Sequence, residues 1–214
     1  MCSRYEAPAP AELVAAFGTE LVEPVQAELW PGYVGPFIRR LQEGDSEEGQ
    51  PGLEAKAGVF GLLPFWAKDQ KLARRTYNAR SETVAEKPSF RAAWREGRHC
   101  LIPASAIYEP DWRSGKAVPT RISRVDGEPM GIAGLWERWV GPSGEVVHSY
   151  TMLTINADDH PLMRNYHKPT DEKRMVVILP RGLYRDWLAA PAANSFEFMR
   201  QYPADRLQVV ERPR

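Results

Sequence analysis

Residues that could hold a metal or form a disulfide are scarce in this chain. Its 214 residues include only two cysteines and four histidines. They show neither Cys-x-x-Cys nor His-Glu-x-x-His spacing, so the common zinc motifs are missing. With so few cysteines and no secretory signal we expect a reducing compartment, where a disulfide between Cys2 and Cys100 is not favoured. We therefore expect no metal site and no cofactor.

The sequence also lacks long apolar runs and any excess of one charge. No stretch approaches the ~20 residues that span a bilayer, and no basic-then-apolar signal opens the chain. Hydrophobic residues make up 43% of the chain and charged residues 26%, which is typical of soluble globular proteins. With 28 basic and 28 acidic side chains, the net charge is zero. Bulk electrostatics therefore do not indicate a nucleic-acid-binding protein.

The charge is nevertheless unevenly distributed. Between Lys68 and Arg98 there are nine basic residues, including Arg74 and Arg75, against four acids. A locally basic face on a neutral protein can still bind phosphates. Trp66 stands just before this stretch, where it could be a core residue or a stacking platform for a base. The alternative is an ordinary solvated face with its counter-charges elsewhere.

No break in composition and no repeat divides the chain. Periodicity and turn signals predict helices over residues 10–18, 81–85, 89–95 and 182–190. They predict strands over residues 24–30, 57–63, 100–108, 120–125, 130–139, 146–155, 174–180 and 207–211, with an exposed acidic loop over residues 42–52. Asp126-Gly127 is a two-residue hairpin signal. We expect one α+β domain over residues 1–214, with a curled antiparallel sheet and short helices.

The first residues place a reactive side chain next to the initiator methionine. Cys2 follows Met1 directly, and methionine aminopeptidases generally accept a small second side chain. Once Met1 is removed, Cys2 carries a thiol and a free α-amine on adjacent carbons, which titrate near pH ~8.5 and ~8. Such a pair can attack an aldehyde through nitrogen and then close through sulfur to a thiazolidine ring. The alternative is an incidental cysteine on a frayed terminus.

Further candidate site residues lie far apart in the sequence, each near the end of a predicted element, where functional side chains often lie. Asn78 and Arg80 precede a predicted helix, whose N-terminal N–H groups suit phosphate. Glu109 ends an apolar strand, and His160 and His167 lie in a long loop. A cysteine, a histidine and a carboxylate could serve either a cysteine peptidase or a covalent aldehyde trap.

Five blocks of this sequence, in order, resemble the SOS response-associated peptidase (SRAP) family. The blocks are Met1-Cys2-Ser3-Arg4, Gly61-Leu62-Leu63-Pro64-Phe65-Trp66-Ala67, Asn78-Ala79-Arg80-Ser81-Glu82, Cys100-Leu101-Ile102-Pro103-Ala104-Ser105 with Tyr108-Glu109, and Arg174-Met175-Val176-Val177-Ile178-Leu179. They extend over nearly the whole chain. Five blocks in this order are more specific for the family than any one block alone.

The resemblance implies an α+β fold with a barrel-like antiparallel core and a positively charged groove for single-stranded DNA. It further implies a sensor of abasic sites in the DNA damage (SOS) response, which links its N-terminal cysteine covalently to the ring-opened sugar. Peptidase, hydrolase and lyase activities belong to the same expectation. The expected partner is single-stranded DNA with abasic sites, bound by a cytoplasmic monomer that associates with the nucleoid and not with a membrane.

The family's functional residues map onto this chain residue by residue. The resemblance implies that Cys2 is the nucleophile, that Asn78 holds the terminus and the sugar, and that Glu109 is a general acid and base. His167 is the nearer match to the family histidine and is preferred to His160, although a short insertion displaces it. The expected DNA-binding residues are Arg4, Trp66, Arg74, Arg75, Arg80 and Arg174, with Trp66 as a wedge against unstacked bases.

Two residues depart from the family pattern. Ser3 stands where the family usually has glycine, and Pro110 stands where a tryptophan commonly follows the glutamate. Both could change the shape of the groove. Two other functions remain open at this point: a cysteine peptidase that uses Cys2, His167 and Glu109, and a non-covalent module for binding single-stranded DNA.

Overall fold

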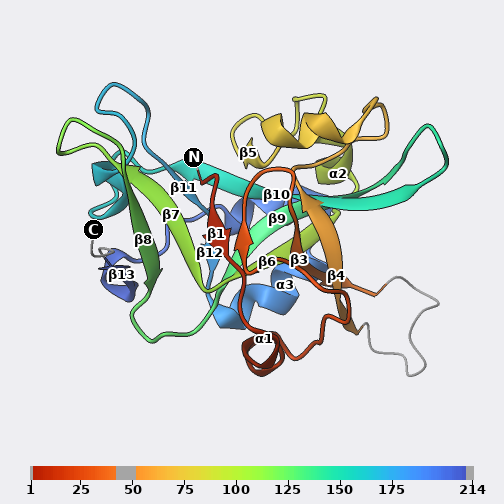
Figure 1. Cartoon of the computed structure of the whole chain (residues 1–214), viewed down its shortest axis with the longest axis horizontal. Helices are drawn as coiled ribbons and strands as arrows, with labels where there is room; N and C mark the ends of the chain where they lie inside the picture. The colour runs from red at the N-terminus through yellow and green to blue at the C-terminus, as the bar shows by residue number, and fades with distance from the viewer. Residues whose placement is uncertain (1, 42–51, 211–214) are drawn as a thin grey trace.

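A closed five-stranded barrel forms the centre of the computed structural model, which describes residues 2–41 and 52–210. Its strands are β3 (Val34–Arg40), β4 (Leu53–Phe60), β6 (His99–Ala104), β9 (Met130–Val140) and β10 (Val146–Asn156). The strands pair in the order β4-β3-β6-β9-β10, and β10 returns to β4 to close the ring. The closing pair is parallel, and the other four pairs are antiparallel. The expected α+β fold with a barrel-like β core is confirmed (Figure 1).

Short strands extend this barrel and form a second sheet beside it. β5 (Asn78–Arg80) and β11 (Arg174–Val176) pair with β10, and β12 (Ile178–Leu179) pairs with β9. The second sheet has the order β13-β8-β7-β1-β2 and is antiparallel throughout. Its strands are β13 (Leu207–Val210), β8 (Val118–Arg124), β7 (Ala106–Asp111), β1 (Tyr5–Glu6) and β2 (Glu28–Leu29).

Helices are few and short. The α-helices are α1 (Pro10–Phe17), α2 (Arg91–Arg95) and α3 (Tyr184–Ala189). The 3-10 helices are η1 (Gln70–Arg75), η2 (Met163–Asn165), η3 (Arg181–Leu183), η4 (Ala192–Phe198) and η5 (Ala204–Arg206). α1 begins at a proline and ends at Gly18, whose φ of 70° is left-handed, as the sequence predicted. No helix in the described ranges is long and apolar enough to cross a membrane.

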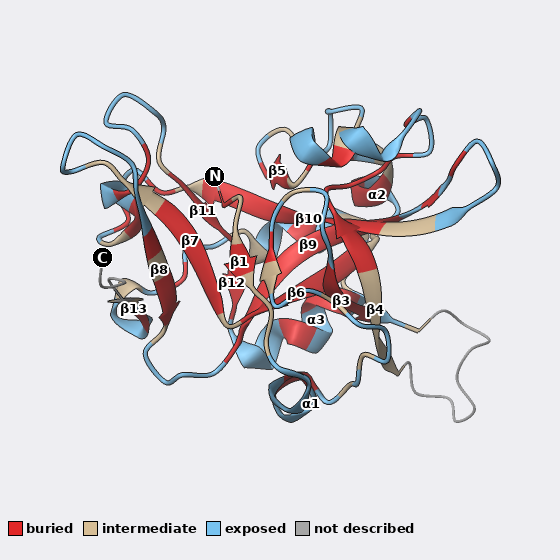
Figure 2. Ribbon diagram, viewed as in Figure 1, coloured by how far each residue is buried: buried red, intermediate tan, exposed pale blue. Residues whose placement is uncertain are grey.

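An aromatic cluster in the core anchors the first strand to the barrel. Tyr5 meets Phe60 edge-on at 5.2 Å, and Phe60 stacks on Tyr150 at 5.6 Å. The two tyrosine hydroxyls lie 2.5 Å apart. Gly35 leaves the room for this cluster, because a Cβ there would lie 2.0 Å from the side chain of Leu29. Figure 2 shows the buried barrel strands that surround it. Packing of Tyr5 therefore fixes the backbone three residues after Cys2.

Several local predictions are wrong, and their failures have a common cause. Residues 81–85 form hydrogen-bonded turns and not a helix. Asp126-Gly127 does not form a hairpin, because it joins β8 in one sheet to β9 in the other. The predicted strand over residues 24–30 is reduced to β2, because only Glu28 and Leu29 pair with β1 at the edge of the second sheet. In each case the tertiary pairing decided the outcome, and the local signal did not.

Other predicted elements exist in the structure but have different bounds. The strand predicted over residues 100–108 is two strands, β6 and β7, which belong to different sheets. Glu109 therefore lies within β7 and not after it. Cys2 and Cys100 are both free and buried. Of the acidic loop predicted over residues 42–52, all but residue 52 lies outside the described residues. The last residue of the strand predicted over residues 207–211 also lies outside them.

Candidate active site

Cys2 lies just before β1 and has no exposed surface. Its carbonyl oxygen accepts a hydrogen bond of 2.7 Å from Nδ2 of Asn78, and its thiol lies 3.4 Å from the carbonyl oxygen of Arg4. The same Arg4 oxygen accepts a bond of 2.9 Å from the backbone N–H of Tyr108 in β7. Strands from three parts of the sequence therefore meet at the thiol.

Asn78 is positioned by β5, which runs parallel to β10 with Asn78 opposite Met152. The asparagine is buried, and its Oδ1 has no hydrogen-bond partner within the described residues. Most buried polar atoms in proteins are hydrogen-bonded, so an unpaired acceptor beside a reactive side chain calls for an explanation. An amine or hydroxyl donor brought next to Cys2 would satisfy it.

Glu109 lies in β7, one residue after Tyr108, and is 1% exposed. Burial raises the pKa of its carboxyl group from 4.5 to about 7, because the charged form loses hydration. At neutral pH the group is therefore close to half protonated. It can both give and take a proton there, which is the property that general acid–base catalysis requires.

His167 faces Glu109 from the loop between β10 and β11. Its Nδ1 lies 3.5 Å from Oε2 of Glu109, and its Nε2 lies 3.1 Å from the carbonyl oxygen of Arg174. A carbonyl oxygen only accepts, so Nε2 carries the proton and Nδ1 presents its lone pair to Glu109. Burial lowers the pKa of His167 from 6.5 to about 4, which keeps the ring neutral.

The backbone of His167 is strained and tightly held. Its φ of 67° is the one positive value among non-glycine residues of the described chain. The backbone N–H donates to the carbonyl oxygen of Pro110 at 2.9 Å, and the neighbouring Tyr166 forms a β-bridge with Asp111. Such left-handed residues persist where the surrounding structure forces them, often at functional sites. Pro110, a departure from the family pattern, thus helps to orient the histidine.

The thiol itself is not activated in this arrangement. Burial, and then the nearby carboxyl group of Glu109, raise the pKa of Cys2 from 9.0 to about 12. The thiol is therefore protonated at neutral pH. In cysteine peptidases, by contrast, the nucleophilic thiol has a lowered pKa because a cationic group lies beside it.

His160 has a structural role. Its Nε2 lies 2.8 Å from the carbonyl oxygen of Tyr202, and its Nδ1 accepts bonds from the backbone N–H groups of Leu162 and Met163. Both ring nitrogens are thus engaged in holding the loop and η2. Of the two histidines considered from the sequence, the structure brings only His167 to Cys2 and Glu109.

Three of the expected DNA-binding arginines form ion pairs within the protein. Arg174 is buried and makes bonds of 2.8 Å from both terminal nitrogens to the carboxylate of Glu82. Arg80 is half-exposed and pairs with Glu172 at 2.8 Å. Arg4 pairs with Glu28 and stacks on the ring of Tyr108. The geometry favours a structural role for Arg174 and Arg4, whereas Arg80 can exchange its exposed partner for a phosphate.

The remaining expected DNA-binding residues are exposed on the segment between β4 and β5. Arg74 and Arg75 end η1, and Trp66 keeps 44% of its surface exposed. Phe65 beside Trp66 is exposed as well, and the sequence reasoning missed two further exposed aromatic side chains, Trp30 and Tyr33. The signal was available, because Trp30-Pro31-Gly32-Tyr33 reads as a turn. In the structure, Gly32 of this turn lies beside the side chain of Arg74.

A second residue that the sequence reasoning missed stands next to Asn78. Tyr77 is half-buried, and burial together with the nearby Cys2 and Glu109 raises the pKa of its phenol. It therefore stays a neutral O–H donor at the mouth of the site. In the sequence, the only signal that Tyr77 lies near the site was its position directly before the Asn78-Ala79-Arg80 block.

Comparison with known sequences adds independent information. A sequence model of the family described as "SOS response associated peptidase (SRAP)" matches residues 1–212. The chain is 38% identical over 130 residues to "Abasic site processing protein YoqW" of Bacillus subtilis (strain 168), which covers 60% of this chain and 54% of that protein. It is 33% identical over 159 residues to "Abasic site processing protein YoaM" of the same strain, covering 71% and 65%. The chain thus spans only part of the length of these curated relatives.

A solved structure is similar over the whole length. A protein of Bordetella bronchiseptica, known from its crystal structure, is 49% identical with a TM-score of 0.89, and the match covers 99% of this chain and 100% of that one. The fold and its connectivity are therefore shared with a protein of known structure.

Proposed function

The chain belongs to the SOS response associated peptidase (SRAP) family, and we propose that it captures abasic sites in single-stranded DNA through a covalent thiazolidine link at Cys2. The proposal requires that Met1 is removed, so that Cys2 supplies an α-amine as well as a thiol. The names of the curated relatives, which are called abasic site processing proteins, agree with this substrate.

One observation carries the proposal. A buried second-position cysteine lies among a carboxyl group with a pKa of about 7, a neutral histidine and an asparagine whose Oδ1 has no partner among the residues that the structure describes. These side chains come from β5, β7 and the loop before β11, and none is adjacent to Cys2 in the sequence. This set provides what condensation of an amine with an aldehyde requires: a nucleophile, a proton donor and a proton acceptor.

The first stage is imine formation. The ring-opened sugar presents an aldehyde, and the nitrogen of Cys2 attacks its carbon, so that a C–N bond forms and the carbonyl electron pair moves to oxygen. That oxygen takes one proton and later leaves as water after taking a second. The amine nitrogen loses both of its protons in this stage, which balances the two that leave with the water. Protonated Glu109 is suited to supply a proton to the leaving water, and His167 Nδ1 is suited to receive a proton from the amine.

The second stage is ring closure. The sulfur of Cys2 attacks the imine carbon, a C–S bond forms, and the thiol proton moves to the imine nitrogen. The net reaction joins protein and sugar with loss of one water molecule. The raised pKa of the thiol fits this order, because the amine reacts first and the sulfur gives up its proton only when the imine stands beside it.

Binding of the strand itself is assigned to the exposed segment beside the site. Trp66 offers an aromatic face to an unstacked base, and Arg74, Arg75 and Arg80 offer charge to phosphates. In Figure 1 the segment from β4 to α2, which carries these residues, lies along the same upper edge of the molecule as the N-terminal end.

The peptidase alternative is less well supported. A peptidase acting on other proteins needs a thiolate, whereas Cys2 is buried and its pKa is raised to about 12. The proton-bearing Nε2 of His167 faces a backbone carbonyl oxygen and not the thiol. Self-removal of Met1 would be compatible with this site, because it needs no second polypeptide in the active centre.

The test is an adduct assay. Protein of verified mass, with and without Met1, is incubated with a single-stranded oligonucleotide that contains one abasic site and then run on a denaturing gel. We expect an adduct only with the processed protein. Cys2→Ala is expected to abolish the stable adduct. Cys2→Ala and Cys2→Ser both keep the α-amine, so each is expected to leave at most a reversible imine that borohydride can trap.

Three results would contradict the proposal. One is an adduct undiminished in Cys2→Ala. Another is cleavage of an unrelated peptide that needs Cys2 and proceeds equally without DNA, which would favour the peptidase. Salt-sensitive binding without any covalent product would leave only a single-strand binding module.

A further inference from the structure

The loop between β10 and β11, which carries His167, is held from two sides. In Figure 1 it lies beside the β7–β8 loop, to the left of the N-terminal end. On the β7 side, the N–H of His167 donates to the carbonyl oxygen of Pro110, and Tyr166 forms a β-bridge with Asp111. These contacts fix the peptide plane that precedes the histidine.

The peptide plane that follows the histidine is held by Lys173. Its ammonium group donates to the carbonyl oxygen of Lys168 and also to that of His167, which lies 3.4 Å away. The φ and ψ angles of a residue relate the two planes on either side of it, so both angles of His167 are restrained. A left-handed residue persists only where its surroundings hold it in this way.

The backbone of Lys173 is itself fixed. Its N–H donates to Oδ1 of Asp158 at 2.9 Å, and its carbonyl oxygen accepts a bond of 2.8 Å from the N–H of Ala157. At the other end of the side chain, the carbonyl oxygen of Lys168 also accepts a bond of 3.0 Å from the N–H of Asp171. The side chain of Lys173 therefore joins two ordered parts of the loop.

The charge of Lys173 is used inside the loop. The side chain is half-buried, and both hydrogen-bond partners of its ammonium group among the described residues are carbonyl oxygens. An ammonium group is strongly hydrated, so this lysine exchanges part of its water for backbone oxygens. Residues 168–173 separate His167 from β11, where the short insertion displaces the histidine. Lys173 thus holds a histidine that the strand no longer fixes directly.

The position of the ring depends on this hold. Nδ1 of His167 lies 3.5 Å from Oε2 of Glu109, and Nε2 lies 3.1 Å from the carbonyl oxygen of Arg174. Proton transfer requires such groups to come within hydrogen-bonding distance, so a rotation of the backbone would separate them. Burial is the main reason that the pKa of His167 is lowered to about 4, and the charge of Lys173 acts in the same direction.

We propose that Lys173 is a positioning residue, which holds the backbone of His167 so that Nδ1 of the ring faces Glu109. It acts through the histidine and contacts neither the DNA nor Cys2. Its effect on adduct formation rests on the proposed capture of abasic sites. Its effect on the histidine ring does not, because the ring can be observed without DNA.

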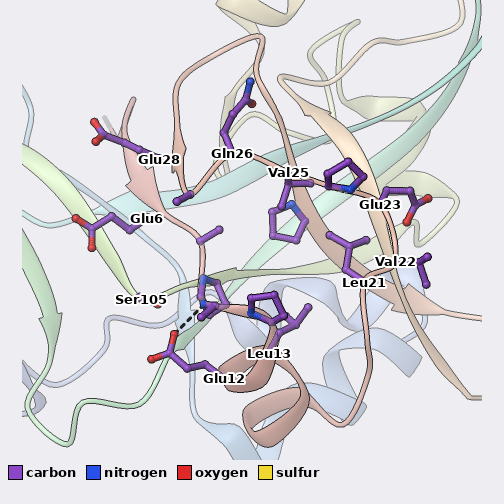
Figure 3. Close-up of a pocket in the computed structure, with 17 residues that line it drawn as sticks. Glu6, Glu12, Leu13, Leu21, Val22, Glu23, Val25, Gln26, Glu28 and Ser105 are labelled. Atoms are coloured by element: carbon purple, nitrogen blue, oxygen red, sulfur yellow. Dashed lines mark hydrogen bonds between the residues drawn. The ribbon is translucent and has the colours of Figure 1, made fainter.

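The large pocket of the molecule is separate from this loop. A pocket of about 810 Å³ lies between residues 6–10 and 21–28 (Figure 3). No residue from 157 to 174, all of which the structure describes, lines it. Effects of variants in the loop can therefore be assigned to the reactive centre and not to this pocket.

The first measurement is the single-turnover rate of adduct formation with saturating abasic DNA. Lys173→Met keeps the length of the side chain but removes its donors, and it is expected to slow the reaction about three- to fivefold. Lys173→Arg restores donors to the carbonyl oxygens and is expected to keep at least about half of the rate. Lys116→Met, which removes the charge of an exposed lysine in the β7–β8 loop, is the control and is expected to leave the rate unchanged.

The second measurement is a double-mutant cycle with the histidine. In a His167→Asn background, Lys173→Met is expected to cause no further loss of rate, because the ring that Lys173 positions is absent. A phosphate contact or a general loss of stability would instead slow or weaken both backgrounds alike.

The third measurement needs no DNA. Two-bond ¹H–¹⁵N spectra of histidine-labelled protein report the tautomer and the pKa of each imidazole, and the signal missing from His167→Asn identifies His167. The wild type is expected to show a neutral ring with its proton on Nε2 at neutral pH. Lys173→Met is expected to raise the pKa of this ring and to mix its tautomers, whereas Lys173→Arg keeps the wild-type signal. Backbone amide spectra of the same samples report the fold.

The proposal is overturned if Lys173→Met slows adduct formation equally with and without His167, or if the tautomer and pKa of the ring stay unchanged. It is also overturned if Lys173→Arg behaves like Lys173→Met. Weaker and less salt-dependent DNA binding with an unchanged rate at saturation would make Lys173 a phosphate contact instead. If the wild type forms no adduct, the capture of abasic sites fails, while the ring signals still decide whether Lys173 positions His167.

Discussion

His167 presents the unprotonated Nδ1 of a neutral imidazole to the buried carboxyl group of Glu109, at 3.5 Å. The carbonyl oxygen of Arg174 fixes this tautomer from the other side of the ring. Only the protonated form of Glu109 can donate to that nitrogen. The two residues therefore hold one transferable proton at the edge of the Cys2 site, which leads to the first two predictions.

Glu109→Gln is expected to slow adduct formation by about 100-fold, in the range that a positioned proton donor contributes. Affinity for an intact single strand should change less than about twofold, because the buried carboxyl group faces the site and not the DNA surface. Single-turnover adduct rates and fluorescence anisotropy measure the two quantities. An equal loss of rate and affinity would make Glu109 a structural residue.

The difference in stability between Glu109→Gln and the wild type should depend on pH in a defined direction. The folded-state pKa of about 7 exceeds the ordinary value of 4.5, so the folded chain binds more protons than the unfolded chain between these pH values. This contribution to stability is present below pH 4.5 and is lost as pH rises through 7. As pH rises from 4.5 to 7, the free energy of unfolding of Glu109→Gln should therefore increase by about 2–3 kcal/mol relative to that of the wild type.

Urea unfolding of the wild type and Glu109→Gln at pH 4.5 and at pH 7 measures this difference in stability. His167→Asn should show the opposite sign, because the pKa of His167 is lowered and its contribution to stability grows as pH rises from about 4 to 6.5. If both variants shift in the same direction, the assigned protonation states are wrong.

The two loop histidines should separate function from stability. At pH 7, His167→Asn is expected to slow adduct formation about tenfold or more while changing the free energy of unfolding by less than about 1 kcal/mol, since asparagine tolerates the left-handed backbone. His160→Ala should instead lower stability by about 2–3 kcal/mol, because it leaves buried groups around η2 unpaired. Thermal unfolding and adduct rates of both variants check this contrast, and a rate loss confined to His160→Ala would contradict it.

Two of the three arginines that pair with acids, Arg174 and Arg80, should also behave differently. Arg174→Gln is expected to lower the free energy of unfolding by about 2–3 kcal/mol, since it removes a buried, bidentate partner of Glu82. Arg80→Gln should change stability by less than about 0.5 kcal/mol and reduce the salt dependence of DNA binding by about one phosphate contact. Denaturation and binding at several salt concentrations distinguish them. Equal effects on stability would show that Arg80 is also structural.

Trp66→Ala is expected to weaken binding of a single strand by about 1–3 kcal/mol, the usual contribution of one stacked base. Its side chain is 44% exposed, so the melting temperature should change little. Trp139→Ala is the opposite case, because Trp139 is 2% exposed and its loss should destabilise the fold. Unchanged DNA affinity in Trp66→Ala would assign the stacking surface to other exposed aromatics, such as Trp30.

The sequence by itself determined the class of fold and pointed to most of the candidate site residues. Alternating apolar residues and turn signals gave the long strands β9 and β10 and the helix α1. Ordered motif blocks pointed to Cys2, Asn78 and Glu109. These signals are local, since they depend on spacing within a few residues.

Tertiary structure alone decided the environment of those residues. Asp126-Gly127 reads as a hairpin, yet β8 and β9 join different sheets, because packing of both barrel and second sheet outweighs one turn preference. Burial of Glu109 moves its pKa to about 7, and a carbonyl oxygen seven residues from His167 sets the histidine tautomer. Arg174, expected from the motif to contact phosphate, is buried in an ion pair with Glu82. Desolvation and hydrogen bonding depend on neighbours that are distant in the chain, so no spacing within the sequence could predict them.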